Sequence, residues 1–430
     1  MVQKESRKGV QPVIPELLAP AGNMAKLVTA IQYGADALYL AGERFGLRAK
    51  AGNFDLPTMA EAIAYARARR VKTYVTINII AHNADLKGLD DYLLELAGLA
   101  PDGLIIADPG ILVRARQLAP QLPVHLSTQA NVTNYAAAQF WLDQGAERLN
   151  LARELSLAEI AEIRAKVTGE LEVFVHGALC ISYSGRCMLS NYMTGRDANQ
   201  GNCAHPCRYS YALVEEKRPG QYFPVEEDER GTYIFNAKDL CLLEKLPLLV
   251  AAGVNALKIE GRMKSIFYVG GVVRVYRAAL DYLAGLPAET WQEPEAIRLP
   301  AAMIVEIGRT GTRGTTENFI SERPGGTEMI YGTSRAEQIF EPIAVVRAGG
   351  APLLVEVRNT LTIGERGEYM GPGISTIPFV ITAMTDAQGL SCPRANPGNV
   401  VRLTTDPPLA EALVNAILRR QRLLPDGAEL

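Results

Sequence analysis

The chain has 430 residues, of which 48% are hydrophobic and 21% are charged, and its formal net charge at pH 7 is −3. These values are close to the globular average and predict two domains with a large core. No apolar run is long enough to span a bilayer, residues 1–12 lack the pattern of a secretory signal, and the basic excess typical of nucleic-acid binding is missing. We therefore expect a cytoplasmic protein without a membrane partner, in which any RNA contact is local.

The first half of the chain repeats a short apolar strand, a polar turn and an amphipathic helix. Helical periodicity is clear at Thr58–Arg69, Leu89–Leu99 and Asn134–Gln144. Eight strands are predicted, at Glu16–Leu18, Ala37–Leu40, Lys72–Asn78, Gly103–Ala107, Val124–Ser127, Arg148–Leu151, Glu172–His176 and Ala256–Glu260. Eight βα units over roughly 250 residues match a TIM-like (β/α)8 barrel. A doubly wound open sheet would show the same alternation, but the number of strands favours the closed barrel.

The spacing of the strands predicts the domain organisation. Residues 1–290 form the β/α barrel, and an insertion at about 177–240, before the last strand, contains the cysteines. Prolines mark residues 291–335 as a linker. Residues 336–430 read as a small C-terminal β-barrel or sandwich, with alternating strands such as Leu353–Val357 and Phe379–Ala383. An amphipathic helix, Leu409–Leu423, is expected to close the chain.

Five of the six cysteines fall in one window, and only Cys392 lies outside it. Clustered cysteines in a reducing cytoplasm indicate metal ligands or catalytic thiols before disulfides. Structural zinc sites use cysteines two to four residues apart, and iron–sulfur clusters accept the wider spacings seen here. We expect four ligands, Cys180, Cys187, Cys203 and Cys241, and leave out Cys207, which lies between Pro206 and Arg208 beside Cys203. The alternative is a chance grouping of buried cysteines.

Polar residues at the carboxyl ends of the predicted strands are the candidates for the active face of a barrel. His176 is a candidate general acid or base, and its alternative is a satisfied histidine lining the barrel mouth. Lys258 is expected to point into the mouth with Glu260 beside it, while Arg262 binds a carboxylate or phosphate. The alternative is a Lys–Glu ion pair that only closes the barrel. Asn78 and Gln129 are further candidates for contacts with substrate.

The segment from Glu172 to Ser190, Glu-Val-Phe-Val-His-Gly-Ala-Leu-Cys-Ile-Ser-Tyr-Ser-Gly-Arg-Cys-Met-Leu-Ser, resembles the signature of the peptidase U32 (collagenase-like) family. The segments Glu16–Gly22, Gly34–Tyr39 and Lys258–Arg262 are similar to that family as well. In the segment around Arg309–Phe319, which is only loosely similar, Asn318 stands where the family has glycine.

The resemblance implies a hydroxylase with a [4Fe–4S] cluster on the same four cysteines. Its length and β-rich tail make the chain similar to the branch that hydroxylates wobble uridine of tRNA to 5-hydroxyuridine, with prephenate implicated. The implied partners are tRNA, a small anionic cosubstrate and a related family subunit.

Two other functional classes remain open. The family name implies a peptidase, but the chain has neither a His-Glu-x-x-His helix nor a Gly-x-Ser-x-Gly elbow, so a thiol protease would need a pair such as Cys180 with His176. A non-catalytic subunit that binds a cluster and serves a partner enzyme is the third possibility.

Overall fold

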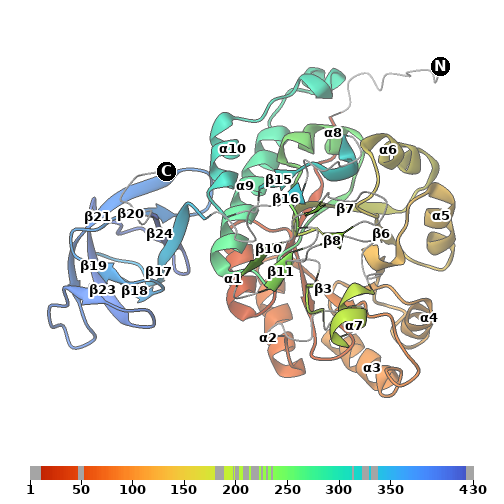
Figure 1. Ribbon diagram of the computed structural model, residues 1–430, viewed down its shortest axis with the longest axis horizontal. Coiled ribbons are helices and arrows are strands. Elements are labelled where there is room, and N and C mark those ends of the chain that lie inside the picture. The colour runs from red at the N-terminus through yellow and green to blue at the C-terminus, as the bar shows by residue number, and fades with distance from the viewer. Residues whose placement is uncertain are drawn as a thin grey trace.

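The computed structural model describes residues 11–46, 53–179, 188–196, 198, 203–206, 213–214, 222–223, 226–228, 231–233, 236–311, 314–321, 329–330 and 338–422. Two barrels lie side by side, and the smaller, C-terminal one is next to α1, α9 and α10 of the larger (Figure 1). No helix in the described ranges combines the length and apolar character that a membrane span requires.

Eight parallel strands form the larger barrel, as predicted. They are β1 (Glu16–Pro20), β2 (Ala37–Ala41), β3 (Lys72–Ile77), β4 (Gly103–Ile106), β5 (Val124–Leu126), β6 (Arg148–Asn150), β7 (Glu170–Gly177) and β14 (Ala256–Ile259). Pairing of β14 with both β7 and β1 closes the sheet. Most of the strands are largely apolar because helices cover the outer face and side chains fill the lumen, and β6 and β7 are the more polar ones. Leu18, Tyr39, Tyr74 and Ile105 are part of the small apolar cluster inside the barrel.

Helices follow most of the barrel strands. They are α1 (Met24–Gln32), α2 (Leu56–Arg67), α3 (Leu89–Leu99), α4 (Pro109–Leu118), α5 (Tyr135–Asp143), α6 (Leu157–Lys166), α8 (Leu246–Ala251) and α9 (Ile266–Ala284). Several begin at a side chain that accepts the backbone N–H three residues later, among them Asn23, Asp55 and Ser265. Ser156 and Glu159 form a full capping box on α6. The local sequence therefore sets where these helices start.

The insertion between β7 and β14 adds a strand to the barrel sheet. β13 (Asp239–Cys241) pairs antiparallel with β7, and β15 (Thr315–Thr316) pairs with β13. The insertion also contains α7 (Leu189–Thr194) and the short strands β8 (Leu213–Val214), β9 (Tyr222–Phe223), β10 (Glu226–Asp228), β11 (Gly231–Tyr233) and β12 (Asn236–Ala237). β12 pairs with β16 (Met329–Ile330), which lies later in the chain, after α10.

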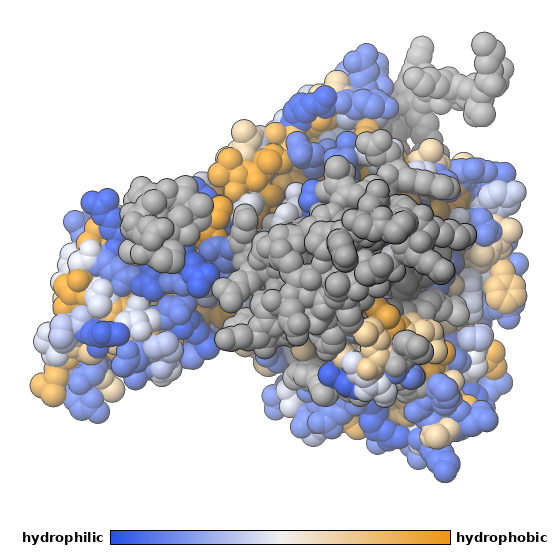
Figure 2. All heavy atoms as spheres, in the orientation of Figure 1, coloured by the Kyte–Doolittle hydropathy of each residue, from blue (hydrophilic) through white to orange (hydrophobic). Residues whose placement is uncertain are grey.

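Six antiparallel strands form the C-terminal domain, and they close into a barrel rather than a sandwich. They are β17 (Phe340–Ala348), β18 (Leu353–Val357), β20 (Arg366–Met370), β21 (Thr376–Thr385), β23 (Val400–Asp406) and β24 (Ile417–Gln421), with a separate pair β19 (Leu361–Thr362) and β22 (Arg394–Ala395). Side chains of β23 alternate between exposed and buried. Figure 2 shows the corresponding mixture of hydrophilic and hydrophobic residues on the visible face of this domain.

The predicted terminal helix, Leu409–Leu423, is wrong. The second half of that segment is β24, which pairs with β17 on one side and β20 on the other and so closes the small barrel. Asn415, just before it, has a φ of 67°, which ends any helical path. The helix-like apolar spacing was overridden because two open strand edges required a partner.

The segment expected to be a linker contains a helix. α10 (Ala301–Gly308) packs against α9 and places Glu306 at the boundary between the two barrels. There Glu306 contacts Arg419 of β24 through both carboxylate oxygens, at 2.5 and 2.9 Å, and lies 3.6 Å from Arg274 of α9. The main core continues across this boundary, since Phe340, Met370 and Ile417 belong to it. The core of the larger barrel thus extends to the boundary, while the small barrel also has a separate core of its own.

Candidate functional site

Amide and hydroxyl groups meet at the carboxyl ends of β3 and β5. The Nδ2 of Asn78, one residue after β3, lies 3.4 Å from both the hydroxyl of Ser127 and the Oε1 of Gln129. Ser127 also donates to Gln129. Asn78 and Ser127 are buried, and Gln129 is half-buried in the short turn Thr128–Ala130. Two of the predicted substrate-binding residues thus lie together, joined by Ser127, which the sequence did not single out.

Arg262 occupies the same end of the barrel from the turn after β14. Its guanidinium is buried and donates to Thr76 and to Asn53, each at 3.2 Å. Glu260, the residue after β14, accepts from the hydroxyl of Tyr39 at 3.3 Å. The backbone carbonyl of Arg262 accepts from Lys26 at 2.7 Å, and burial together with the Arg262 charge lowers the pKa of that lysine. Cations and polar groups therefore surround this end of the barrel.

Lys258 does not point into the mouth. Its backbone is in register with Phe174, but its ammonium group bonds Glu172 at 2.8 Å, and Glu172 is in register with Ala256, nearer the amino ends of the strands. Both side chains are buried, and the ammonium lies over the ring of Tyr39. Lys258 is therefore engaged in a Lys–Glu ion pair inside the lumen, the alternative that the sequence left open, with Glu172 as the partner.

His176 faces the helix layer outside the barrel rather than the mouth. The pairing of β14 with β7 skips Val175, so His176 is in register with Ile259, whose side chain belongs to the outer core. A bulge of one residue reverses the direction of the following side chain. The His176 ring packs against Tyr268 and Tyr276 of α9, and burial lowers its pKa to about 4. The imidazole is neutral at physiological pH.

Cys241 lies beside His176, since the two are register partners in the β13–β7 pair. Burial raises the pKa of the Cys241 thiol, against the opposing effect of the Leu243 N–H and the Tyr276 hydroxyl. Cys203 is half-buried, and its sulfur accepts the backbone N–H of His205 at 3.3 Å. Each of these two sulfurs thus receives an N–H from the residue two positions later. The other predicted ligands, Cys180 and Cys187, and Cys207 lie outside the described residues.

Asn318 occupies a position that requires an unusual backbone. Its φ is 52°, in the left-handed region, and its side chain donates to the carbonyl of Arg153 at 2.8 Å. Asparagine tolerates this conformation better than other residues with a Cβ. Asn318 therefore adopts the left-handed backbone that would be expected of a glycine at this position.

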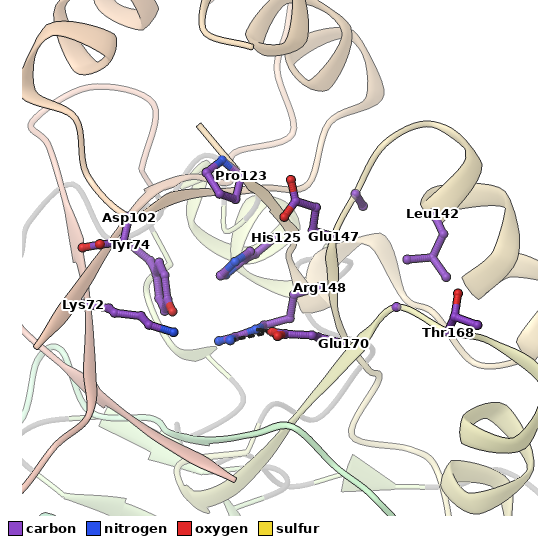
Figure 3. A pocket seen from close by; sticks show the side chains of 12 residues that line it. Lys72, Tyr74, Asp102, Pro123, His125, Leu142, Glu147, Arg148, Thr168 and Glu170 are labelled. Atoms are coloured by element: carbon purple, nitrogen blue, oxygen red, sulfur yellow. Dashed lines mark hydrogen bonds and ion pairs between the residues drawn. The ribbon is translucent and has the colours of Figure 1, made fainter. Parts of the chain in front are cut away.

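A charged network fills the opposite end of the barrel, where the strands begin. Arg148 bonds Glu16 at 2.6 Å and Glu170 at 2.7 Å, and Lys72 bonds Glu16 at 3.0 Å. A cavity of about 550 Å³ opens there, and Figure 3 shows Lys72 and Arg148 among the side chains that line it, near Tyr74. Each of these cations has a carboxylate partner, and the side chains of Lys72 and Glu170 are exposed where they line the cavity.

Two protein-family models match this chain, one in each domain. The model of Peptidase family U32 matches residues 22–330, and that of the Peptidase family U32 C-terminal domain matches residues 343–419. The chain belongs to peptidase family U32. The U32 match begins just after β1 and spans the other seven barrel strands, the inserted strand β13 and helix α10, so it includes most of the segment expected to be a linker.

Relatives of this U32 chain cover both of its domains. It is 38% identical to the tRNA hydroxylation protein P1 of Bacillus subtilis, over 91% of this chain and 92% of that one. It is 36% identical to the tRNA hydroxylation protein P of Escherichia coli, over 90% and 92%. A third relative, the 23S rRNA 5-hydroxycytidine C2501 synthase of Escherichia coli, is 34% identical over 72% of this chain and 46% of that one.

Proposed function

We propose that this chain is an iron–sulfur enzyme that hydroxylates tRNA. The observation that carries the proposal is the identity of 36–38% to two proteins named for tRNA hydroxylation, over at least 90% of each chain. The finer proposal is conversion of wobble uridine to 5-hydroxyuridine, with prephenate as a small anionic cosubstrate. A wobble base lies in a single-stranded loop, so an enzyme can reach it without opening a duplex.

A [4Fe–4S] cluster bound by Cys180, Cys187, Cys203 and Cys241 is part of the proposal. A thiolate accepts hydrogen bonds far better than a thiol, and N–H groups directed at sulfur are a common means of tuning clusters. The N–H groups of His205 and Leu243 meet the sulfurs of Cys203 and Cys241 in this way. When bound, the cluster would supply electron transfer or a Lewis-acidic iron. The donor set suits iron, because soft thiolates are its usual protein ligands.

The chain's own residues would bind and orient the substrate at the carboxyl ends of the strands. A uracil edge offers two acceptors and one donor, and the amides of Asn78 and Gln129 together offer both kinds of group. The Arg262 guanidinium is held by Thr76 and Asn53 and would attract a carboxylate or phosphate. Glu260, whose carboxylate accepts a hydrogen bond from Tyr39, would accept a proton or a hydrogen bond from a substrate hydroxyl group there. Lys258 has no direct role in this proposal because Glu172 occupies its ammonium group.

The test is anaerobic purification of the wild type and two cysteine variants, with iron and sulfide analysis. We expect about four irons and four sulfides per chain in the wild type, a loss of most of them in Cys241→Ala, and none of that loss in Cys392→Ala. Cys392 is a matched control because it lies in the C-terminal barrel, where its sulfur donates to the carbonyl of Arg394. Nucleoside mass spectrometry of tRNA from cells that lack or express each variant then tests the reaction. Absence of iron, or zinc in its place, would overturn the proposal.

A further inference from the structure

Tyr276 of α9 brings a hydroxyl group to the point where β7 and β13 meet. The side chain is fully buried. Its hydroxyl donates to the carbonyl of Val175 at 2.8 Å and lies 3.4 Å from the Nδ1 of His176. The sulfur of Cys241 lies 4.0 Å from the same hydroxyl. One hydroxyl thus has three polar neighbours, and one of them is a proposed cluster ligand.

The hydrogen-bond count leaves the Tyr276 proton free to change partner. A tyrosine hydroxyl has one proton to donate and lone pairs that accept. The Val175 carbonyl has a second donor, because the backbone N–H of Leu242 reaches it at 2.8 Å. If Tyr276 turned its proton toward Cys241, that carbonyl would still be satisfied. The Val175 carbonyl therefore keeps a hydrogen bond whether the Tyr276 proton points to it or to Cys241.

Ligation of iron by Cys241 would decide between these partners. A cysteine sulfur that binds a cluster has no proton and is a charged acceptor, which attracts a donor more strongly than a neutral carbonyl does. His176 then completes the set, since its Nδ1–H can donate to the tyrosine oxygen and hold the hydroxyl in place.

We propose that Tyr276 is a positioning residue that donates its hydroxyl proton to the sulfur of Cys241 and thereby raises the reduction potential of the bound cluster. This inference rests on the proposed function, in that it requires the cluster. A hydrogen bond to a ligating sulfur withdraws electron density and stabilises the reduced, more negative cluster. Tyr276 therefore acts through Cys241 and does not touch substrate.

The experiment compares midpoint potentials of the anaerobically prepared full chain in three forms. Tyr276→Phe keeps the ring and removes the hydroxyl. Tyr268→Phe is the matched control, because Tyr268 lies on the same helix, packs against the same His176 ring and donates to the carbonyl of Glu260 at 3.0 Å. We expect Tyr276→Phe to retain the iron of the wild type and to shift the potential to more negative values. Tyr268→Phe should leave the potential where it is.

A second substitution should shift the midpoint potential in the opposite direction. Replacing Tyr276 by 3-fluorotyrosine makes the hydroxyl a stronger donor, so the potential should move to more positive values. This variant also serves if Tyr276→Phe fails to fold or to hold iron. An unchanged potential in the tested variants, or an equal shift in Tyr268→Phe, would overturn the role of Tyr276. A wild type without iron would instead overturn the proposed function and is recognised before any potential is measured.

Discussion

Glu306 is the residue whose loss should most weaken the boundary between the two barrels. Its carboxylate contacts Arg419 through both oxygens and also lies near Arg274, and both arginine side chains are fully buried. Glu306→Gln keeps the shape but removes the negative charge. Breaking a buried ion pair by removing one partner costs about 3–5 kcal/mol, because the remaining charge is left in a medium of low dielectric constant. Glu368 remains as a second acceptor for Arg419, so we expect about 3 kcal/mol.

The assay is thermal unfolding of the full chain. The entropy of unfolding scales with the number of residues that unfold together. A loss of about 3 kcal/mol in unfolding free energy therefore lowers Tm by about 4 °C if both barrels unfold as one unit, and by about 15 °C if the C-terminal barrel unfolds alone. Phe340, Met370 and Ile417 of the small barrel pack into the core of the larger one, and this contact favours the smaller shift. The control is Glu162→Gln, which removes an exposed pair with Lys166 and should change stability by less than about 0.5 kcal/mol. A Tm for Glu306→Gln equal to that of the control would refute the reasoning.

Four further predictions follow from single contacts. Lys258→Met should destabilise the chain by about 3 kcal/mol in chemical denaturation, because Glu172 is left buried with less compensation; a stable variant with weakened anion binding would instead favour a role in the mouth. Ser156→Ala should cost about 1 kcal/mol by the same measurement through loss of the α6 capping box. Asn318→Gly should be tolerated and Asn318→Val should destabilise, because valine does not adopt a φ of 52°, and equal melting of the two variants would contradict this. Since His176 has a folded pKa of about 4, below its unfolded value, the unfolding free energy should fall as the pH drops from about 6.5 to 4, and His176→Phe should reduce that dependence.

The strands of the larger barrel could be predicted because most are short, largely apolar segments that alternate with helical periodicity and are buried on both faces. The predicted start of β2 at Ala37 and both ends of β18 agree with the structure. The amide groups of Asn78 and Gln129 near the ends of β3 and β5 could also be predicted, since parallel strands bring their carboxyl ends together, but the Ser127 hydroxyl between them was not singled out. The fold class and part of the polar mouth thus follow from local pattern.

Other features depend on contacts that no local pattern contains. The one-residue bulge at Val175 turns the side chain of His176 to the outer face of the barrel, and the residue types in this strand do not reveal the bulge. The bond between Arg148 and Glu16 joins positions 132 residues apart. β24 is a strand only because β17 and β20 lie on either side of it. In each case, tertiary pairing determined what the local sequence left undetermined.

The pairing of β13 with β7 also limits how the sequence can change in length. Cys241 is held opposite His176 by the ladder, and neighbouring residues of a strand face opposite sides of a sheet. Inserting or deleting one residue within Asp239–Cys241 would present a leucine in place of the cysteine and turn the sulfur to the other face. Gene variants in this segment should therefore be substitutions rather than insertions or deletions, and an engineer who lengthens the insertion should do so before Asp239.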